Sequence, residues 1–111
     1  MQGNCIKAID LPLMNFLAIL SRSTILVAND GGSLYMGVFL GIKTVSIFGP
    51  VSDIVYGPYP QDVKKHVVAK KDLPCRPCYK KFKLPECLHQ MKCLKSITVN
   101  EVFSSVRGFL D

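Results

Sequence analysis

Residues 24–48, which read TILVANDGGSLYMGVFLGIKTVSIF, decide the fold of this chain. The stretch holds two short apolar runs, Thr24 to Ala28 and Lys43 to Phe48, whose lack of polar alternation is typical of strands covered on both faces. The small and apolar residues from Ser33 to about Leu40 predict a short buried helix, closed by Gly41 in a left-handed conformation. Because strands joined by such a helix pair in parallel, the sequence predicts an α/β fold built on a βαβ unit.

Helices are predicted on both sides of this unit. Asp10 and Pro12 give a helix-start signal, and apolar residues then recur with helical spacing to about Arg22. At the other end, Thr98 and Glu101 have the spacing of a capping box, so a second helix is expected to start at Thr98.

Two weaker strands are expected at Cys5 to Ala8 and at His66 to Ala69. From Leu73 to Lys95 no periodicity is visible, which predicts an irregular segment rich in cysteine and lysine. With 111 residues, 49% of them hydrophobic, we expect one domain with one core over residues 1–111.

The composition and the N-terminus also bear on location. No apolar run approaches the ~20 residues of a membrane-spanning helix, and no secretory signal is recognisable at the start of the chain. We therefore expect a cytoplasmic protein. Its five cysteines are then expected to be thiols or metal ligands rather than disulfides.

The positive charge is concentrated in one region. Residues 63–95 hold nine lysines and Arg76 against Asp72 and Glu86, a local charge of +8, whereas the net charge of the whole chain is +6. Such a region suits phosphates of a nucleotide, a nucleic acid or an anionic membrane. The alternative is a solvated lysine-rich loop.

The loop after the first strand is the best candidate for a ligand site. Ligands of parallel sheets bind outside the carboxyl ends of the strands, where this loop, Asn29-Asp30-Gly31-Gly32-Ser33, is expected. The glycines let an anionic group approach the amides that start the next helix, Ser33 adds a hydroxyl, and Asp30 can accept hydrogen bonds from a sugar. Gly49 follows the second strand and is expected on the same rim. The alternative is an ordinary tight turn with a capping serine.

The order of these motifs resembles the C-terminal half of glycosyltransferase family 9, the lipopolysaccharide heptosyltransferase family. The family pattern runs from Ile-Ser-Arg through Asn-Asp-(Thr or Gly)-Gly-x-x-His and Thr-Val-x-Ile-Phe-Gly-Pro to a Cys-x-Pro-Cys segment. The matching stretches here are Leu20-Ser21-Arg22, Asn29-Asp30-Gly31-Gly32, Leu40-Gly41, Thr44-Val45-Ser46-Ile47-Phe48-Gly49-Pro50, Cys75-Arg76-Pro77-Cys78 and Ile97-Thr98-Val99-Asn100-Glu101-Val102.

The resemblance implies a GT-B enzyme of two Rossmann-like domains, in which the C-terminal domain binds a nucleotide-diphosphate sugar. It puts Asp30 and Gly32, with the residues that start the following helix, at the donor's sugar and diphosphate. Tyr35 stands where the family has a histidine; tyrosine can donate a hydrogen bond but is not cationic at neutral pH.

By the same resemblance the reaction is inverting and needs no bound metal, and its acceptor is a lipopolysaccharide-type or other glycan, which can be lipid-linked. In this family the catalytic base belongs to an N-terminal domain, which lies outside this chain. The resemblance therefore implies that this chain is a partial Rossmann-like three-layer domain, with no catalytic residues and no transfer activity of its own. A lipid-linked acceptor implies peripheral contact with the anionic inner face of the cytoplasmic membrane.

Four cysteines in the irregular segment could hold a structural zinc ion. Cys75 and Cys78 have the two-residue gap common in zinc sites, and Cys87 and Cys93 form a looser second pair, with His89 as a substitute ligand. The alternatives are a redox-labile disulfide and reduced thiols that only pack.

Two other functions compete with the glycosyltransferase. One is a small zinc module whose basic segment binds RNA or DNA, although such a module has no use for the βαβ unit or the glycine-rich loop. The other is a different nucleotide-sugar enzyme of the same architecture, such as an epimerase. We favour the glycosyltransferase and expect no nucleic-acid partner.

Overall fold

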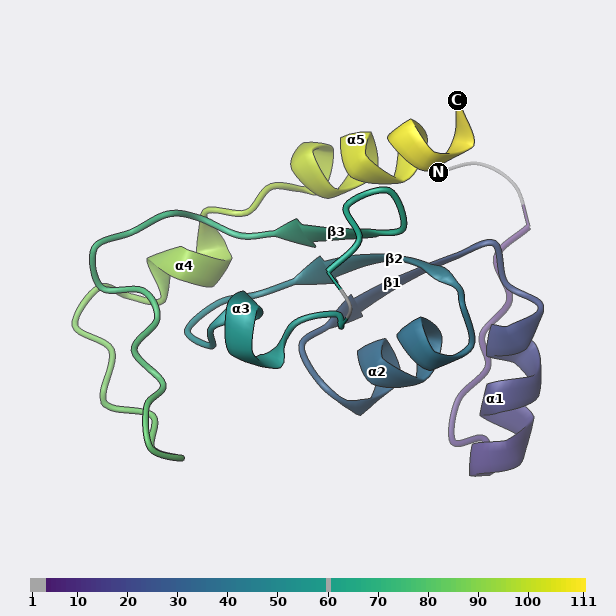
Figure 1. Cartoon of the computed structure of the whole chain (residues 1–111), viewed down its shortest axis with the longest axis horizontal. Helices are drawn as coiled ribbons and strands as arrows, with labels where there is room; N and C mark the ends of the chain where they lie inside the picture. Colours follow the sequence, from purple (N-terminus) through teal and green to yellow (C-terminus); the bar gives the residue numbers. More distant parts are fainter. Residues whose placement is uncertain (1–3, 60) are drawn as a thin grey trace.

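The computed structural model describes residues 4–59 and 61–111 and contains one parallel sheet (Figure 1). Its strands are β1 (Ile25–Asn29), β2 (Lys43–Ile47) and β3 (His66–Ala69), in the order β1-β2-β3. Val27 lies opposite Val45, and Val45 lies opposite Val67. The predicted parallel βαβ unit and the weaker strand at His66 are both confirmed.

Helices lie on both faces of the sheet, so the predicted three-layer, partial Rossmann-like α/β arrangement is confirmed (Figure 1). On one face α2 (Gly32–Phe39) packs on β1 and β2, and α1 (Leu13–Ser21) packs against α2. On the other face α5 (Val99–Leu110) contacts β2 and β3. Two short helices, α3 (Asp53–Tyr56) and α4 (Lys92–Lys95), lie beyond the carboxyl ends of the strands.

Burial differs sharply between the two strands of the βαβ unit. In β2, the central strand, Thr44, Val45 and Ser46 are fully buried, as predicted for a strand covered on both faces. The same prediction is wrong for β1, where Val27 is 47% exposed. The reason is position, because β1 forms an edge of the sheet and its apolar run alone does not reveal this.

Two glycines shape the connection between β1 and β2. Gly41 has a φ of +77°, which confirms the predicted left-handed residue at the end of α2. Gly37 lets α2 approach the sheet, since a Cβ at this position would lie 2.6 Å from Cδ2 of Leu26. The crossover helix therefore packs on β1 without an intervening side chain.

The predicted helix ends are confirmed in one case and corrected in the other. In α5 the Thr98 hydroxyl accepts from the Glu101 backbone N–H at 3.1 Å, and the Glu101 carboxylate accepts from the Thr98 backbone N–H at 3.0 Å. In α1, by contrast, Pro12 itself is the N-cap and no side chain caps the helix. Asp10 lies outside with a φ of 56°, so its expected role at the helix start is wrong.

One predicted strand is absent and two short helices were not predicted, one of them, α4, inside the otherwise irregular segment expected from Leu73 to Lys95. The strand expected at Cys5 to Ala8 is absent; these residues are exposed and have no neighbouring strand with which to pair. The helices α3 and α4 have only four residues each, too few for an apolar period to be visible in the sequence. Between Ala69 and Lys92 the segment is otherwise irregular, apart from a bridge between Lys80 and Lys83.

The molecule exposes much of its apolar surface. Its accessible surface is 8503 Å², whereas a compact monomer of its mass would expose roughly 6,100 Å². The fully buried part of the core is small and centres on Leu34, Val45 and Phe48. Within the described ranges, no helix has the length and apolarity needed to cross a membrane.

Candidate functional site at the carboxyl ends of the strands

The loop Asn29 to Ser33 leaves β1 at the carboxyl edge of the sheet, beside the end of β2. The backbone N–H of Asp30 donates to the carbonyl of Ile47 at 3.2 Å and extends the strand pairing by one residue. The loop therefore shares a rim with the Phe48–Gly49–Pro50 exit of β2, as the sequence predicted.

The two glycines of the loop leave the N-terminus of α2 open. Gly31, the N-cap, has φ 157° and ψ −168°, a conformation that is essentially restricted to glycine, and no side chain caps the helix. A Cβ added at Gly31 or Gly32 would meet no atom within 4 Å. The first amides of α2 lack intrahelical acceptors, as at any helix start, and can receive an anion.

Asp30 is half-buried beside these amides. Burial raises the pKa of its carboxyl group, although its own backbone N–H lowers it in part. Together with Phe16 of α1 and the end of β1, the loop lines a shallow hollow of about 370 Å³. The hollow thus combines an apolar wall, a carboxylate and a helix N-terminus.

Tyr35 is 43% exposed, but its hydroxyl already has a hydrogen-bond partner in the chain. Its hydroxyl donates to the carbonyl of Tyr56 at the end of α3, and the Tyr56 ring packs edge-on against Tyr79 with centroids 6.0 Å apart. Burial, then the charge of Asp30, then Tyr56 raise the pKa of the Tyr35 phenol, so it stays protonated at neutral pH. The hydroxyl hydrogen of Tyr35 is therefore already donated within the chain. A contact between Tyr35 and a ligand stays a prediction.

Gly49 is buried beneath the irregular segment. A Cβ at Gly49 would lie 2.5 Å from Cγ of Leu94, and the Gly49 carbonyl accepts from Nε of Arg76 at 2.7 Å. The close approach that this glycine permits in the structure is therefore that of Leu94. A contact between Gly49 and a ligand stays a prediction.

Arg76 is a key residue whose role no pattern in the sequence indicated. Its NH2 group donates to the Val51 carbonyl at 3.1 Å and to the Asp53 carboxylate at 3.0 Å, and Lys70 pairs with the same carboxylate at 2.9 Å. Although burial disfavours the Asp53 anion, these hydrogen bonds outweigh it and lower its pKa. The network fixes the cysteine-rich segment to the exit of β2.

The four cysteines of this segment line one cavity of about 430 Å³, with His89 also on its wall. None is in a disulfide. Burial, followed by the nearby thiols of Cys78, Cys87 and Cys75, raises the pKa of Cys93. As they are placed, however, no three histidine, cysteine, aspartate or glutamate side chains in residues 4–59 and 61–111 stand close enough together to hold a metal ion.

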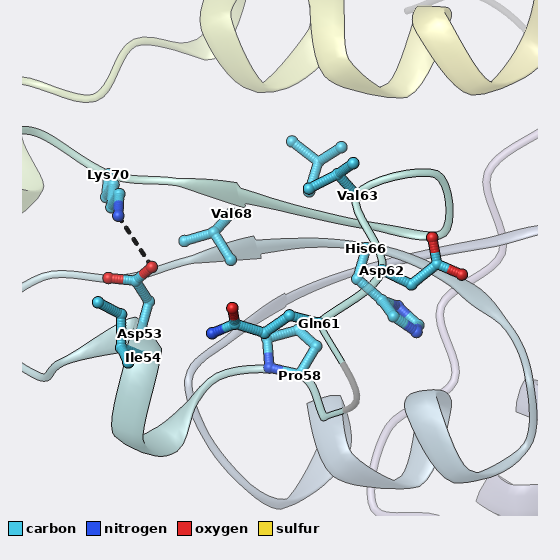
Figure 2. A pocket seen from close by; sticks show the side chains of 10 residues that line it. Asp53, Ile54, Pro58, Gln61, Asp62, Val63, His66, Val68 and Lys70 are labelled. Atoms are coloured by element: carbon cyan, nitrogen blue, oxygen red, sulfur yellow. Dashed lines mark hydrogen bonds and ion pairs between the residues drawn. The ribbon is translucent and has the colours of Figure 1, made fainter.

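A further hollow of about 420 Å³ lies between α3 and β3 and contains none of the predicted site residues (Figure 2). Its charged groups already have partners: Lys70 pairs with Asp53, and the Asp62 carboxylate accepts from the Lys64 backbone N–H at 3.0 Å. The buried His66 ring lies 2.9 Å from the Thr44 hydroxyl. We therefore assign no ligand to this hollow.

Comparison with known proteins gives two matches. The chain is 31% identical over 85 residues to lipooligosaccharide heptosyltransferase 2 of Campylobacter jejuni subsp. jejuni serotype O:2, which covers 76% of this chain and 25% of that relative. It is 32% identical over 82 residues to lipooligosaccharide heptosyltransferase 2 of serotype O:6, covering 73% and 24%. The chain thus spans about a quarter of the length of these curated relatives.

No family model matches the chain, and no solved structure gives a significant match. The similarity to the two curated relatives agrees with the order of motifs along the sequence and with the α/β sheet. It supports a partial relationship between this chain and the heptosyltransferases, a kind of glycosyltransferase.

Proposed function

We propose that this chain is the donor-binding part of a family 9 glycosyltransferase that takes a sugar from a nucleotide-diphosphate donor. The observation that carries the proposal is the open, uncapped N-terminus of α2 at Gly31 and Gly32, on the carboxyl rim of the sheet. A helix start of this kind binds phosphate through its amides and dipole.

Asp30, Gly32 and Ser33 have direct roles in this proposal. The amides of Gly32 and Ser33 donate to a phosphate oxygen of the donor, with the Ser33 hydroxyl as a further donor. Asp30 accepts hydrogen bonds from a sugar hydroxyl, and Asn29 lies exposed at the end of β1. The same amides stabilise the charge that develops on the nucleoside diphosphate as it leaves, without a bound metal.

The remaining steps belong to the rest of a longer protein. In the proposed mechanism, a base outside this chain deprotonates an acceptor hydroxyl, which attacks the anomeric carbon and expels the nucleoside diphosphate with inversion. The large exposed surface and the free edge of β1 are suited to packing against that remainder. We therefore expect no sugar transfer by this chain alone.

Calorimetric titration with ADP- and UDP-sugars tests donor binding, using Gly32→Ala and Gly108→Ala as a matched pair. Both glycines lie in helices with no atom within 4 Å of an added Cβ, so both substitutions should leave the fold intact. Only Gly32→Ala places a methyl group where the phosphate would sit. We expect it to weaken binding roughly tenfold, or about 1.4 kcal/mol, while Gly108→Ala binds like the wild type.

Asp30→Asn tests the carboxylate separately, because it preserves the size of the side chain. We expect weaker binding of the sugar nucleotide and little change for the free nucleoside diphosphate. Failure of every nucleotide sugar to bind would overturn the proposal. Tight, salt-dependent RNA binding in its place would favour the nucleic-acid module.

We further propose that the basic segment touches an anionic membrane, as a lipid-linked acceptor would require. Lys80 and Lys83 exchange backbone hydrogen bonds of 3.1 and 2.9 Å and close a turn whose tip is Lys81 and Phe82. The irregular stretch between β3 and α4 projects beyond the strand ends (Figure 1). The Phe82 side chain at the tip of the turn is 85% exposed among these lysines. An apolar tip surrounded by cations suits the interface of an anionic bilayer.

Sedimentation with phosphatidylcholine vesicles, with and without phosphatidylglycerol, tests this contact. Phe82→Ser should reduce binding to the anionic vesicles, whereas Phe39→Ser, at a 90% exposed phenylalanine of α2, should not. Lys81→Gln should cost about 1 kcal/mol of binding free energy, or roughly fivefold. Equal binding to both kinds of vesicle would argue against the proposal.

A further inference from the structure

Four cysteines spread over residues 75–93 line one cavity beside the β2 exit. Cys75 and Cys78 come from the loop after β3, Cys87 from the following irregular stretch, and Cys93 from α4. The fifth cysteine, Cys5, lies outside this cavity and is exposed. The fold therefore gathers four of five thiols in one place, which packing of small apolar groups alone does not require.

Two backbone amides orient the sulfur of Cys87. Its sulfur accepts hydrogen bonds from the backbone N–H groups of His89 at 3.4 Å and Met91 at 3.2 Å. Donors that point at a sulfur fix its orientation, as the outer shell of a metal site does. Gln90 and Met91 have positive φ angles of 56° and 57°, conformations that are uncommon for these residues.

The cysteine loop is anchored independently of the thiols. The Pro50 carbonyl accepts from the backbone N–H groups of Cys78 at 3.0 Å and Tyr79 at 3.2 Å, and Arg76 is fixed to Gly49. An ion held by four thiolates carries two net negative charges; Arg76 and Lys92 line the same cavity, against a single carboxylate, Glu86. Because Arg76 already pairs with Asp53, Lys92 is the cation of the cavity wall that is left to face such a centre.

From these contacts we infer that Cys75, Cys78, Cys87 and Cys93 bind one zinc ion as a structural site. Zinc accepts four thiolates in a tetrahedron, and the two-residue gap lets the first pair converge on one ion. The side chains must turn inward to do so, because they do not converge as placed. Between Cys75 and Met91 the segment contains no helix, and its only strand-like contact is the Lys80–Lys83 bridge, so the side chains can turn without unfolding an element. Each bound thiol releases its proton to the buffer.

The inference does not depend on the proposed function, since the site would order the segment whatever the rim binds. Its test is metal analysis of the chain purified without chelator and under reducing conditions. We expect about one zinc ion per chain in the wild type and in the matched control Cys5→Ser. Cys78→Ser should lose most of the zinc, and His89→Ala should keep it; loss of zinc from His89→Ala would overturn the all-cysteine ligand set.

Cobalt substitution of the wild type gives a second readout that does not rely on a variant that folds. Tetrahedral Co²⁺ with four thiolates should show intense sulfur-to-metal charge-transfer absorption and strong visible bands. Zinc far below one equivalent would overturn the inference, whether thiol counting then finds four free cysteines or a disulfide. A weak, octahedral cobalt spectrum would overturn it as well.

Discussion

Replacing Arg76 with methionine tests whether the irregular segment is held to the sheet by the guanidinium. The Arg76 side chain is 7% exposed and donates three hydrogen bonds, to the carbonyls of Gly49 and Val51 and to Asp53. Methionine keeps the length of the side chain but removes all three. The Asp53 carboxylate, itself 13% exposed, would then retain only Lys70 as its cation.

The expected cost follows from the burial of this pair. Breaking a buried ion pair costs about 3–5 kcal/mol, and we take about 3 kcal/mol because Lys70 still compensates Asp53. For a chain of 111 residues, about 4 °C of melting temperature is lost per kcal/mol, which predicts a decrease of roughly 12 °C. Asp53→Asn should be destabilising too, and the two effects should not add, because both remove the same contact.

The assay is urea unfolding followed by circular dichroism, with chelator and reductant present so that metal binding does not contribute. Arg22→Met is the matched control, since Arg22 is exposed and its side chain has no hydrogen bond within the described residues. It should change the free energy of unfolding by less than about 0.5 kcal/mol. An Arg76→Met protein as stable as this control would refute the assigned role of Arg76.

Three further substitutions test the sheet and its helices. Gly37→Ala should lower the free energy of unfolding by about 1–2 kcal/mol because its Cβ would overlap Leu26, whereas Gly108→Ala, in open space, should not lower it. Equal unfolding midpoints of the two variants in urea would contradict this. Burial lowers the pKa of His66, so the unfolded chain takes up a proton before the native chain does as pH falls below about 6.5, and the free energy of unfolding decreases. Urea titrations across a pH series should show a smaller decrease in His66→Gln. Thr98→Ala should lower the free energy of unfolding by about 1 kcal/mol through loss of the α5 cap, and an unchanged melting temperature would count against the cap.

Much of the backbone followed from local sequence patterns. The apolar runs around Val27 and Val45 predicted strands, the capping box at Thr98 predicted the start of α5, and Gly41 predicted the end of α2. These signals act between residues close in the chain, where backbone sterics and capping hydrogen bonds operate. The position of the Asn29 to Ser33 loop on the carboxyl rim followed from the parallel order of the strands.

Tertiary contacts decided what those patterns left open. Sequence could not show that β1 is an edge strand, that Gly49 lies under Leu94, or that Arg76 reaches Asp53, because each depends on residues brought together from distant parts of the chain. The spacing of the cysteines suggested a zinc site, but only the fold shows that all four thiols line one cavity. Local sequence thus determined the three strands of the sheet and its longer helices, and long-range packing determined which side chains remain open to a ligand.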